Sequence, residues 1–212
     1  MDVPVSKKNP DGVTTRHGHC ANNPSHKDFI HSDELNEIAK EHFTELKGPP
    51  KADDLGFKNK GNRYDEFIRG WTQFWNDTLN PKDRLDPNLV KALIATESGF
   101  NPNPKVGAVK ARGLMQVTDS TRKILANPKG ELHDHLVEID QKDITDPNLN
   151  IAAGTRWLFR KKDLAGVRLK RTATWDEAVA EYKSYLKDMI KDPKYLPKPM
   201  AEFRKYYKQL SE

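Results

Sequence analysis

The sequence predicts a mainly α-helical domain with a small β-ribbon or loop region and an N-terminal helical extension. Asp-Pro pairs at 86–87 and 146–147 each place a capping carboxylate before a proline at the first helical position. Thr174 opens another helix through a capping box with Glu177. Apolar residues then recur at helical spacing after each of these signals, which indicates that each helix has one buried face.

The chain divides into two parts by composition. Residues 1–61 are predicted to form an irregular leader followed by a helical extension, and residues 62–212 form the main domain, with its motifs in 86–185. Ser32 is the expected cap of the helix in the extension, and the Gly-Pro-Pro run at 48–50 stops it. A charged segment with glycines, 51–61, reads as a linker to the main domain.

Helical periodicity places the remaining elements of the main domain. The predicted helices cover 64–79, 87–98, 118–126, 147–159, 174–192 and a last segment around 203–210. Residues 101–113 suit a loop or small β-ribbon, and residues 129–143 a polar connection. The aromatic stripe of the helix 64–79 follows the period of a buried face, so we expect it to lie in the core.

Composition limits the class of protein. The 212 residues have a net charge of +5, which favours an anionic partner such as nucleic acid, a membrane surface or an acidic polysaccharide. No apolar run approaches the roughly 20 residues of a membrane span, and the polar residues 1–11 do not resemble a secretory signal. Cys20 is the only cysteine, so no internal disulfide forms.

Glu97 is the carboxylate whose position suggests chemistry. It falls in the last turn of the helix 87–98, just before a loop rich in glycine and proline. The negative end of the helix dipole and the neighbouring Phe100 both favour the protonated carboxyl, which is the form a general acid needs. A solvated surface glutamate is the alternative that position alone leaves open.

Four ordered motifs resemble the soluble lytic transglycosylase domain, a lysozyme-like α+β fold that cleaves bacterial peptidoglycan. They are Glu-Ser-x-Phe-Asn-Pro at 97–102, Gly-Leu-Met-Gln at 113–116, Asp-Pro-x-x-Asn-Ile-x-x-Gly at 146–154, and Tyr182. The resemblance covers about 86–185 and is specific because the motifs occur in order and at sensible intervals. Asn150 and Gly154 within the third motif are expected to serve helix packing.

The resemblance implies a reaction that needs one carboxylate. Glu97 would protonate the glycosidic oxygen between N-acetylmuramic acid and N-acetylglucosamine, and would then take the proton of the muramoyl 6-hydroxyl as that oxygen attacks C1. The product is a 1,6-anhydromuramoyl end, and no second carboxylate has to activate water. Asp119, the nearest later acid, is expected to serve as a helix-start residue.

The resemblance also implies substrate contacts. Gln116 and Tyr182 would hydrogen-bond sugars, Met115 would pack beside them, and Ser98 would steady Glu97 or an acetamido group. For Met115 and Ser98, a purely structural role is the alternative.

Two departures from the family pattern affect the outer sugar contacts. Residues 182–185 read Tyr-Lys-Ser-Tyr where the family has Tyr-Asn-x-Gly, and Lys105-Val106 precede Gly107-Ala108 where a serine is usual.

Other clusters of reactive or charged residues carry less weight. His17, His19, Cys20, His26 and His31 include zinc-ligand types, but their spacing fits no standard four-ligand site. We therefore expect no metal and no cofactor, and His133 and His135 read as loop residues. The basic groups at 160–162 and 168–171 read as solvated helix ends, and no motif indicates nucleic-acid binding.

The expected activity is therefore that of a lytic transglycosylase acting on peptidoglycan glycan strands in the periplasm or cell wall. A water-using muramidase and a catalytically weak peptidoglycan-binding module are the alternatives. Without a signal peptide, export by a dedicated secretion system or release by lysis is expected. We favour an antibacterial effector with an inhibitory (immunity) partner or a secretion-apparatus partner.

Overall fold

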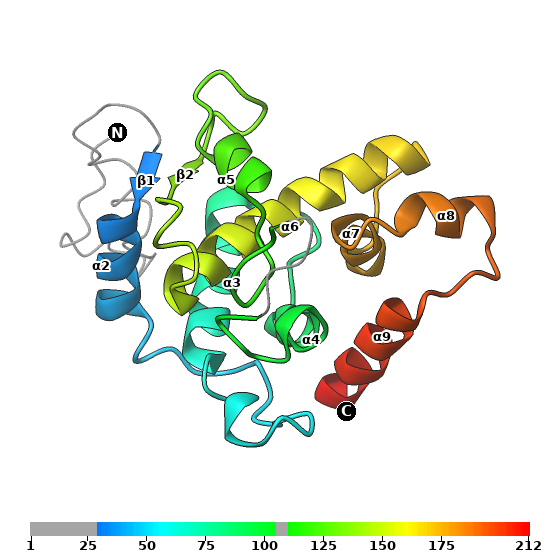
Figure 1. Ribbon diagram of the computed structural model, residues 1–212, viewed down its shortest axis with the longest axis horizontal. Helices are drawn as coiled ribbons and strands as arrows, with labels where there is room; N and C mark the ends of the chain where they lie inside the picture. The colour runs from blue at the N-terminus through cyan, green and yellow to red at the C-terminus, as the bar shows by residue number, and fades with distance from the viewer. Residues whose placement is uncertain (1–28, 105–109) are drawn as a thin grey trace.

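The computed structural model describes residues 29–104 and 110–212, and it is mainly helical (Figure 1). Its longer helices pack into one hydrophobic core that extends from Ile30 to Leu210. The elements in chain order are β1 (Phe29–His31), α2 (Ser32–His42), η1 (Lys58–Lys60), α3 (Asp65–Leu79), α4 (Pro87–Ser98), α5 (Asp119–Leu125), β2 (Leu136–Glu138), α6 (Pro147–Leu169), α7 (Trp175–Tyr182), α8 (Leu186–Lys191) and α9 (Lys198–Ser211). Within the described ranges, no helix combines the length and apolar character that crossing a membrane requires.

The aromatic stripe of α3 lies in the core, as its periodicity predicts. Trp71, Phe74 and Trp75 are fully buried and stack edge to face against one another. The indole N–H of Trp71 donates to Asn148 Oδ1 at 2.7 Å, and that of Trp75 donates to the Ala152 carbonyl at 3.0 Å. These bonds satisfy both buried donors and fix the long helix α6 against α3.

The extension packs on the main domain through a parallel strand pair that the sequence pattern does not predict. Strand β1 pairs with β2, with Phe29 opposite Leu136, inside the region predicted as a polar connection. The partner strands are too far apart in sequence for a local pattern to reveal the pairing. Helix α2 lies beside α6, where Asn148 Nδ2 donates to the Leu35 carbonyl at 3.3 Å and to Asn36 Oδ1 at 2.9 Å (Figure 1).

Three predicted helix boundaries are wrong. Helix α6 continues to Leu169, ten residues past the predicted end at 159. The extension helix begins at Ser32 itself, with His31 as its N-cap residue, and it ends at His42, before the Gly-Pro-Pro run at 48–50 that was expected to stop it. The single helix predicted over 174–192 is divided into α7 and α8. Ser184 adopts a left-handed φ of +64°, and the Tyr185 N–H bonds the Ala180 carbonyl at 2.8 Å, a closure typical of a helix C-terminus.

Helix α4 is held from both sides. The ammonium of Lys91 is fully buried and binds Asp65 at 2.9 Å, Asn62 Oδ1 at 2.7 Å and the Lys51 carbonyl at 2.8 Å. This network ties the segment predicted as a linker to α4. A buried charge with this many partners is strongly position-specific, because removing one partner leaves the charge uncompensated.

Helix α9 covers the other side of α4 (Figure 1). Met200, Phe203 and Leu210 are buried. The Tyr207 hydroxyl donates to Asp86 Oδ2 at 3.0 Å, so the C-terminal helix contacts the residue that caps α4.

Candidate active site

Local sequence fixes Glu97 at the end of α4. The Asp86 side chain accepts the Asn88 N–H at 2.8 Å, and Pro87 takes the first helical position, as predicted. The helix closes at Gly99, whose φ of +57° is left-handed and suits a glycine. Glu97 is thus in the last turn, with 16% of its side chain exposed.

The partner of Glu97 is Lys183. The Lys183 ammonium lies 2.5 Å from Glu97 Oε1, and only 5% of the lysine side chain is exposed. Lys183 directly follows α7, so the fold brings together residues 86 positions apart. The sequence pattern does not predict this contact, because it shows Lys183 only as a departure from the family's asparagine. The signal available was an unusual cation beside a motif tyrosine.

A tight turn carries the second motif. Arg112 and Val117 form an antiparallel bridge with hydrogen bonds of 3.0 and 2.9 Å. Between them, Gly113 has a φ of +73°, and a Cβ built there would lie 2.2 Å from Asn150 Nδ2. Only glycine therefore fits at this position. Gln116 ends the turn with a φ of +51°, and its side-chain amide donates to the Gly113 carbonyl at 2.9 Å.

Tyr182 connects this turn to the region of Glu97. Its hydroxyl donates to the Met115 carbonyl at 2.6 Å. Burial raises the pKa of Tyr182 well above its usual range, and the charge of Glu97 raises it further, so the phenol lies within electrostatic reach of that carboxylate. Glu97, Tyr182, Lys183 and the 112–117 turn therefore form one site.

Met115 and Ser98 make contacts within the protein. The Met115 side chain is fully buried, and its sulfur lies 3.8 Å from the Thr155 hydroxyl and directly against Gly154. The Ser98 hydroxyl donates to the Ile94 carbonyl one turn earlier, at 3.3 Å. Sugar contacts by Met115, Ser98, Gln116 and Tyr182 stay predictions.

Asn150 supports the turn from beneath, in agreement with its expected packing role. Its side-chain oxygen accepts the Met115 N–H at 2.7 Å, while its amide donates to the Ile144 carbonyl at 2.7 Å and the Arg112 carbonyl at 3.1 Å. With three bonds made, the amide is locked in place. These hydrogen bonds fix the position of the turn relative to α6.

Asp119, His31 and His133 make contacts within the protein. Asp119 pairs with Arg122 at 2.9 Å and Lys123 at 3.1 Å in the first turn of α5. His31 pairs with Glu138 at 3.1 Å, and His133 bonds the Gly130 carbonyl at 3.0 Å.

Over residues 29–104 and 110–212, no three potential metal ligands gather. The predicted ligand types His17, His19, Cys20 and His26, and the departure at Lys105 to Ala108, lie outside the described residues.

A comparison with known families places this site within a recognised domain. The family model described as "Transglycosylase SLT domain" matches residues 76–192, more than half of the chain. The match contains Glu97, the 112–117 turn, Tyr182 and Lys183.

Proposed function

We propose that this chain, which belongs to the Transglycosylase SLT domain family, is a lytic transglycosylase that cleaves the β-1,4 bond between N-acetylmuramic acid and N-acetylglucosamine. Peptidoglycan is the substrate of this family, and the 1,6-anhydromuramoyl product is our more specific proposal. The observation that supports it best is the largely buried Glu97 at the end of α4, beside Tyr182 and Lys183.

In the proposed reaction, one carboxyl group serves twice. The Glu97 carboxyl gives its proton to the glycosidic oxygen as the bond from that oxygen to C1 breaks. The muramoyl 6-hydroxyl oxygen then bonds to C1, and its proton passes to the Glu97 carboxylate, which restores the acid. No water is consumed. Asp119 is held by two cations at the start of α5, which agrees with its expected helix-start role.

Lys183 gives this site a feature of its own. Its ammonium donates a hydrogen bond to Glu97 Oε1 at 2.5 Å. This hydrogen bond has to break before Oε1 can contact a glycosidic oxygen. The Tyr182 hydroxyl, already donating to the Met115 carbonyl, retains its lone pairs for a sugar donor. We propose that Gln116 and Tyr182 bind sugar hydroxyl or acetamido groups, with Ser98 and Met115 supporting them.

Loss of the Glu97 carboxyl tests this proposal. Purified sacculi incubated with the native chain should release soluble fragments, and Glu97→Gln should reduce the rate by at least about a hundredfold, the scale of general acid catalysis. Glu37→Gln, an exposed carboxylate on α2, is the matched control and should keep the native rate. Equal rates for the native chain and Glu97→Gln would remove Glu97 from the mechanism.

Two alternatives correspond to distinct results. Reducing muramic acid ends in the digest would identify a muramidase that uses water at the same site. Binding of sacculi without turnover by the native chain would identify a peptidoglycan-binding module, a result favoured if the Lys183 contact holds Glu97 permanently.

We also propose that the protein is an antibacterial effector acting in the periplasm or cell wall, with an inhibitory partner in its producer. The support is the location of peptidoglycan outside the cytoplasmic membrane. Targeting the chain to the periplasm of a test bacterium should cause lysis, whereas cytoplasmic expression should not. Absence of harm in both compartments would overturn this proposal.

A further inference from the structure

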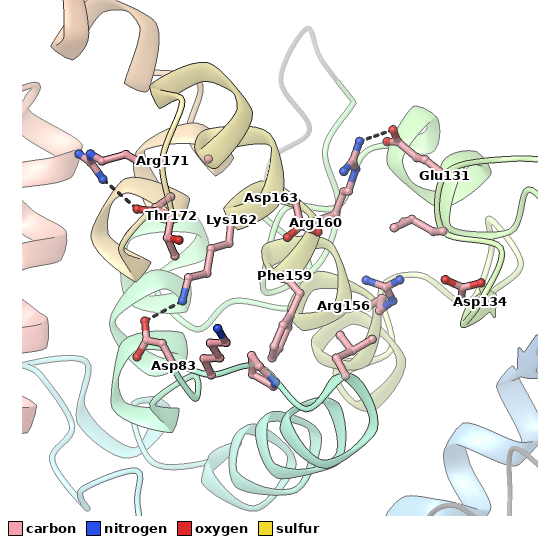
Figure 2. Close-up of a pocket in the computed structure, with 16 residues that line it drawn as sticks. Asp83, Glu131, Asp134, Arg156, Phe159, Arg160, Lys162, Asp163, Arg171 and Thr172 are labelled. Carbon is pink, nitrogen blue, oxygen red and sulfur yellow. Dashed lines mark hydrogen bonds and ion pairs between the residues drawn. The ribbon is translucent and has the colours of Figure 1, made fainter.

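A second candidate site lies in a groove on α6 on the side away from the active-site turn. Gly154 of α6 contacts Met115, whereas Arg156 lies two positions further on and so projects on nearly the opposite side of the helix. There, Arg156, Phe159, Arg160 and Asp163 line a cavity of about 690 Å³. We call it the α6 groove. The loops after α3, around residue 132 and at 171–173 form its other walls (Figure 2).

The floor of the α6 groove is cationic. Arg156 is 5% exposed, and Lys162 and Arg160 keep 13% and 18% of their side chains exposed. Two members of the basic group at 160–162, predicted to be a solvated helix end, are therefore mostly buried in the floor of the groove. Arg160 Nε is buried without a hydrogen-bond partner. Apolar side chains of Phe159 and Leu132, both buried, complete the lining.

Acidic side chains at the rim neutralise two of the three cations. Asp83, 60% exposed, binds Lys162 at 2.6 Å, and Glu131 binds Arg160 (Figure 2). Arg156 differs from both. Its Nε donates to the His135 carbonyl at 3.4 Å and its guanidinium lies 5.7 Å from the Trp75 ring, with no carboxylate in ion-pair range among the described residues.

Arg156 therefore has spare capacity for an anion. Burial lowers the pKa of Arg156 to about 10, so the group stays protonated at neutral pH. A guanidinium has five donors in a planar fork that matches a carboxylate, and within the described residues only the Nε–H of Arg156 donates to a protein acceptor. Arg156 lines the groove, so its guanidinium borders the space that a ligand would occupy (Figure 2).

Asp163 supplies the opposite charge at the rim. It lies on the same face of α6 as Arg156 and Arg160, and it is exposed. Partial burial raises the pKa of the Asp163 carboxyl, and the charges of Arg160 and Arg156 lower it by less. Its carboxylate is positioned to accept an amine from a ligand that also contacts the floor.

We propose that the α6 groove binds a short peptide with a free carboxylate and a free amine, the carboxylate pairing with Arg156 and the amine with Asp163. A volume of about 690 Å³ falls within the range of small-ligand sites and exceeds what a lone phosphate fills. The ligand class rests on the proposed function, because peptidoglycan strands carry short peptides with both groups. The groove would then hold a peptide while the Glu97 site acts on the glycan.

Calorimetric titration tests the proposal on the full chain. The probe is a synthetic tripeptide of alanine, glutamate and lysine, which should bind saturably to the native chain. Arg156→Met and amidation of the peptide's carboxyl groups should each weaken affinity at least tenfold, and Asp163→Asn should weaken it less. Arg63→Met removes an exposed guanidinium outside the groove and should leave affinity unchanged.

Controls separate this proposal from folding effects and from catalysis. Thermal unfolding of Arg156→Met checks its fold, and the amidated peptide tests the same contact on the unaltered chain. Glu97→Gln should bind the tripeptide with native affinity, so a failed mechanism at Glu97 leaves this result intact. No saturable binding, equal affinity for the amidated peptide, or displacement of the peptide by equimolar inorganic phosphate would overturn the proposal.

Discussion

Replacing Gly113 with alanine should destabilise the protein more than the same change at any other left-handed glycine of the described residues, namely Gly48, Gly56 and Gly99. The new methyl group would meet Asn150 at 2.2 Å, and that amide cannot withdraw without giving up its three hydrogen bonds. The left-handed φ of +73° costs alanine about 1 kcal/mol. Three hydrogen bonds at about 1 kcal/mol each bring the total to about 4 kcal/mol.

Gly56 provides the matched control, because it has a φ of +82° and nothing within 4 Å of an added Cβ. Gly56→Ala should therefore cost only the backbone strain, about 1 kcal/mol. In thermal unfolding, a loss of about 4 kcal/mol in unfolding free energy lowers the midpoint temperature by about 8–16 °C for a chain of this size. Urea unfolding measures the same free-energy loss directly. Equal losses in the two variants would show that Asn150 does not fix the turn, and would refute the reasoning.

Three further predictions concern the site and acid stability. Lys183→Met should raise the initial rate of sacculus solubilisation by up to about tenfold, because Glu97 no longer has to leave a charged hydrogen-bond partner; a lower rate that Lys183→Arg restores would contradict this. Tyr182→Phe should lower the unfolding free energy by about 1 kcal/mol, through loss of its hydroxyl's bond to the turn; an unchanged value in urea unfolding would argue against the bond. The Arg171 hydrogen bond lowers the pKa of Glu177 from 4.5 to about 2, so its stabilisation is complete above pH 4.5 and lost as pH falls towards 2. Arg171→Met should lower the free energy of unfolding slightly at neutral pH, since solvent screens the exposed guanidinium, and should have no effect below pH 2; a pH-independent difference between the two chains would contradict the assignment.

Local signals predicted the helical framework well. Asp86, Asp146 and Thr174 cap α4, α6 and α7 where the sequence indicated, since a capping side chain acts only on the first turn that follows it. The aromatic residues of α3 recur at helical spacing, and the face that they form is the buried one. Each of these features is decided within a few residues along the chain.

Features decided by distant partners were missed. Strands β1 and β2 pair across more than a hundred residues, and neither is long enough to show its own period. Apolar residues at helical spacing lie on both sides of Ser184. The periodicity therefore gives no sign that the helix breaks there. The ion pair of Lys183 with Glu97 depends on how α7, which packs on α6, places its C-terminal end relative to α4. The α6 groove depends on three separate loops.

The most direct test of the central claim is the chemical form of the cleaved glycan. Mass spectrometry of sacculi digested by the native chain should show 1,6-anhydromuramoyl ends, and Glu97→Gln should yield none above an untreated control. Anhydro ends produced equally by Glu97→Gln, or reducing ends in place of anhydro ends with the native chain, would contradict the claim that Glu97 acts first as acid and then as base.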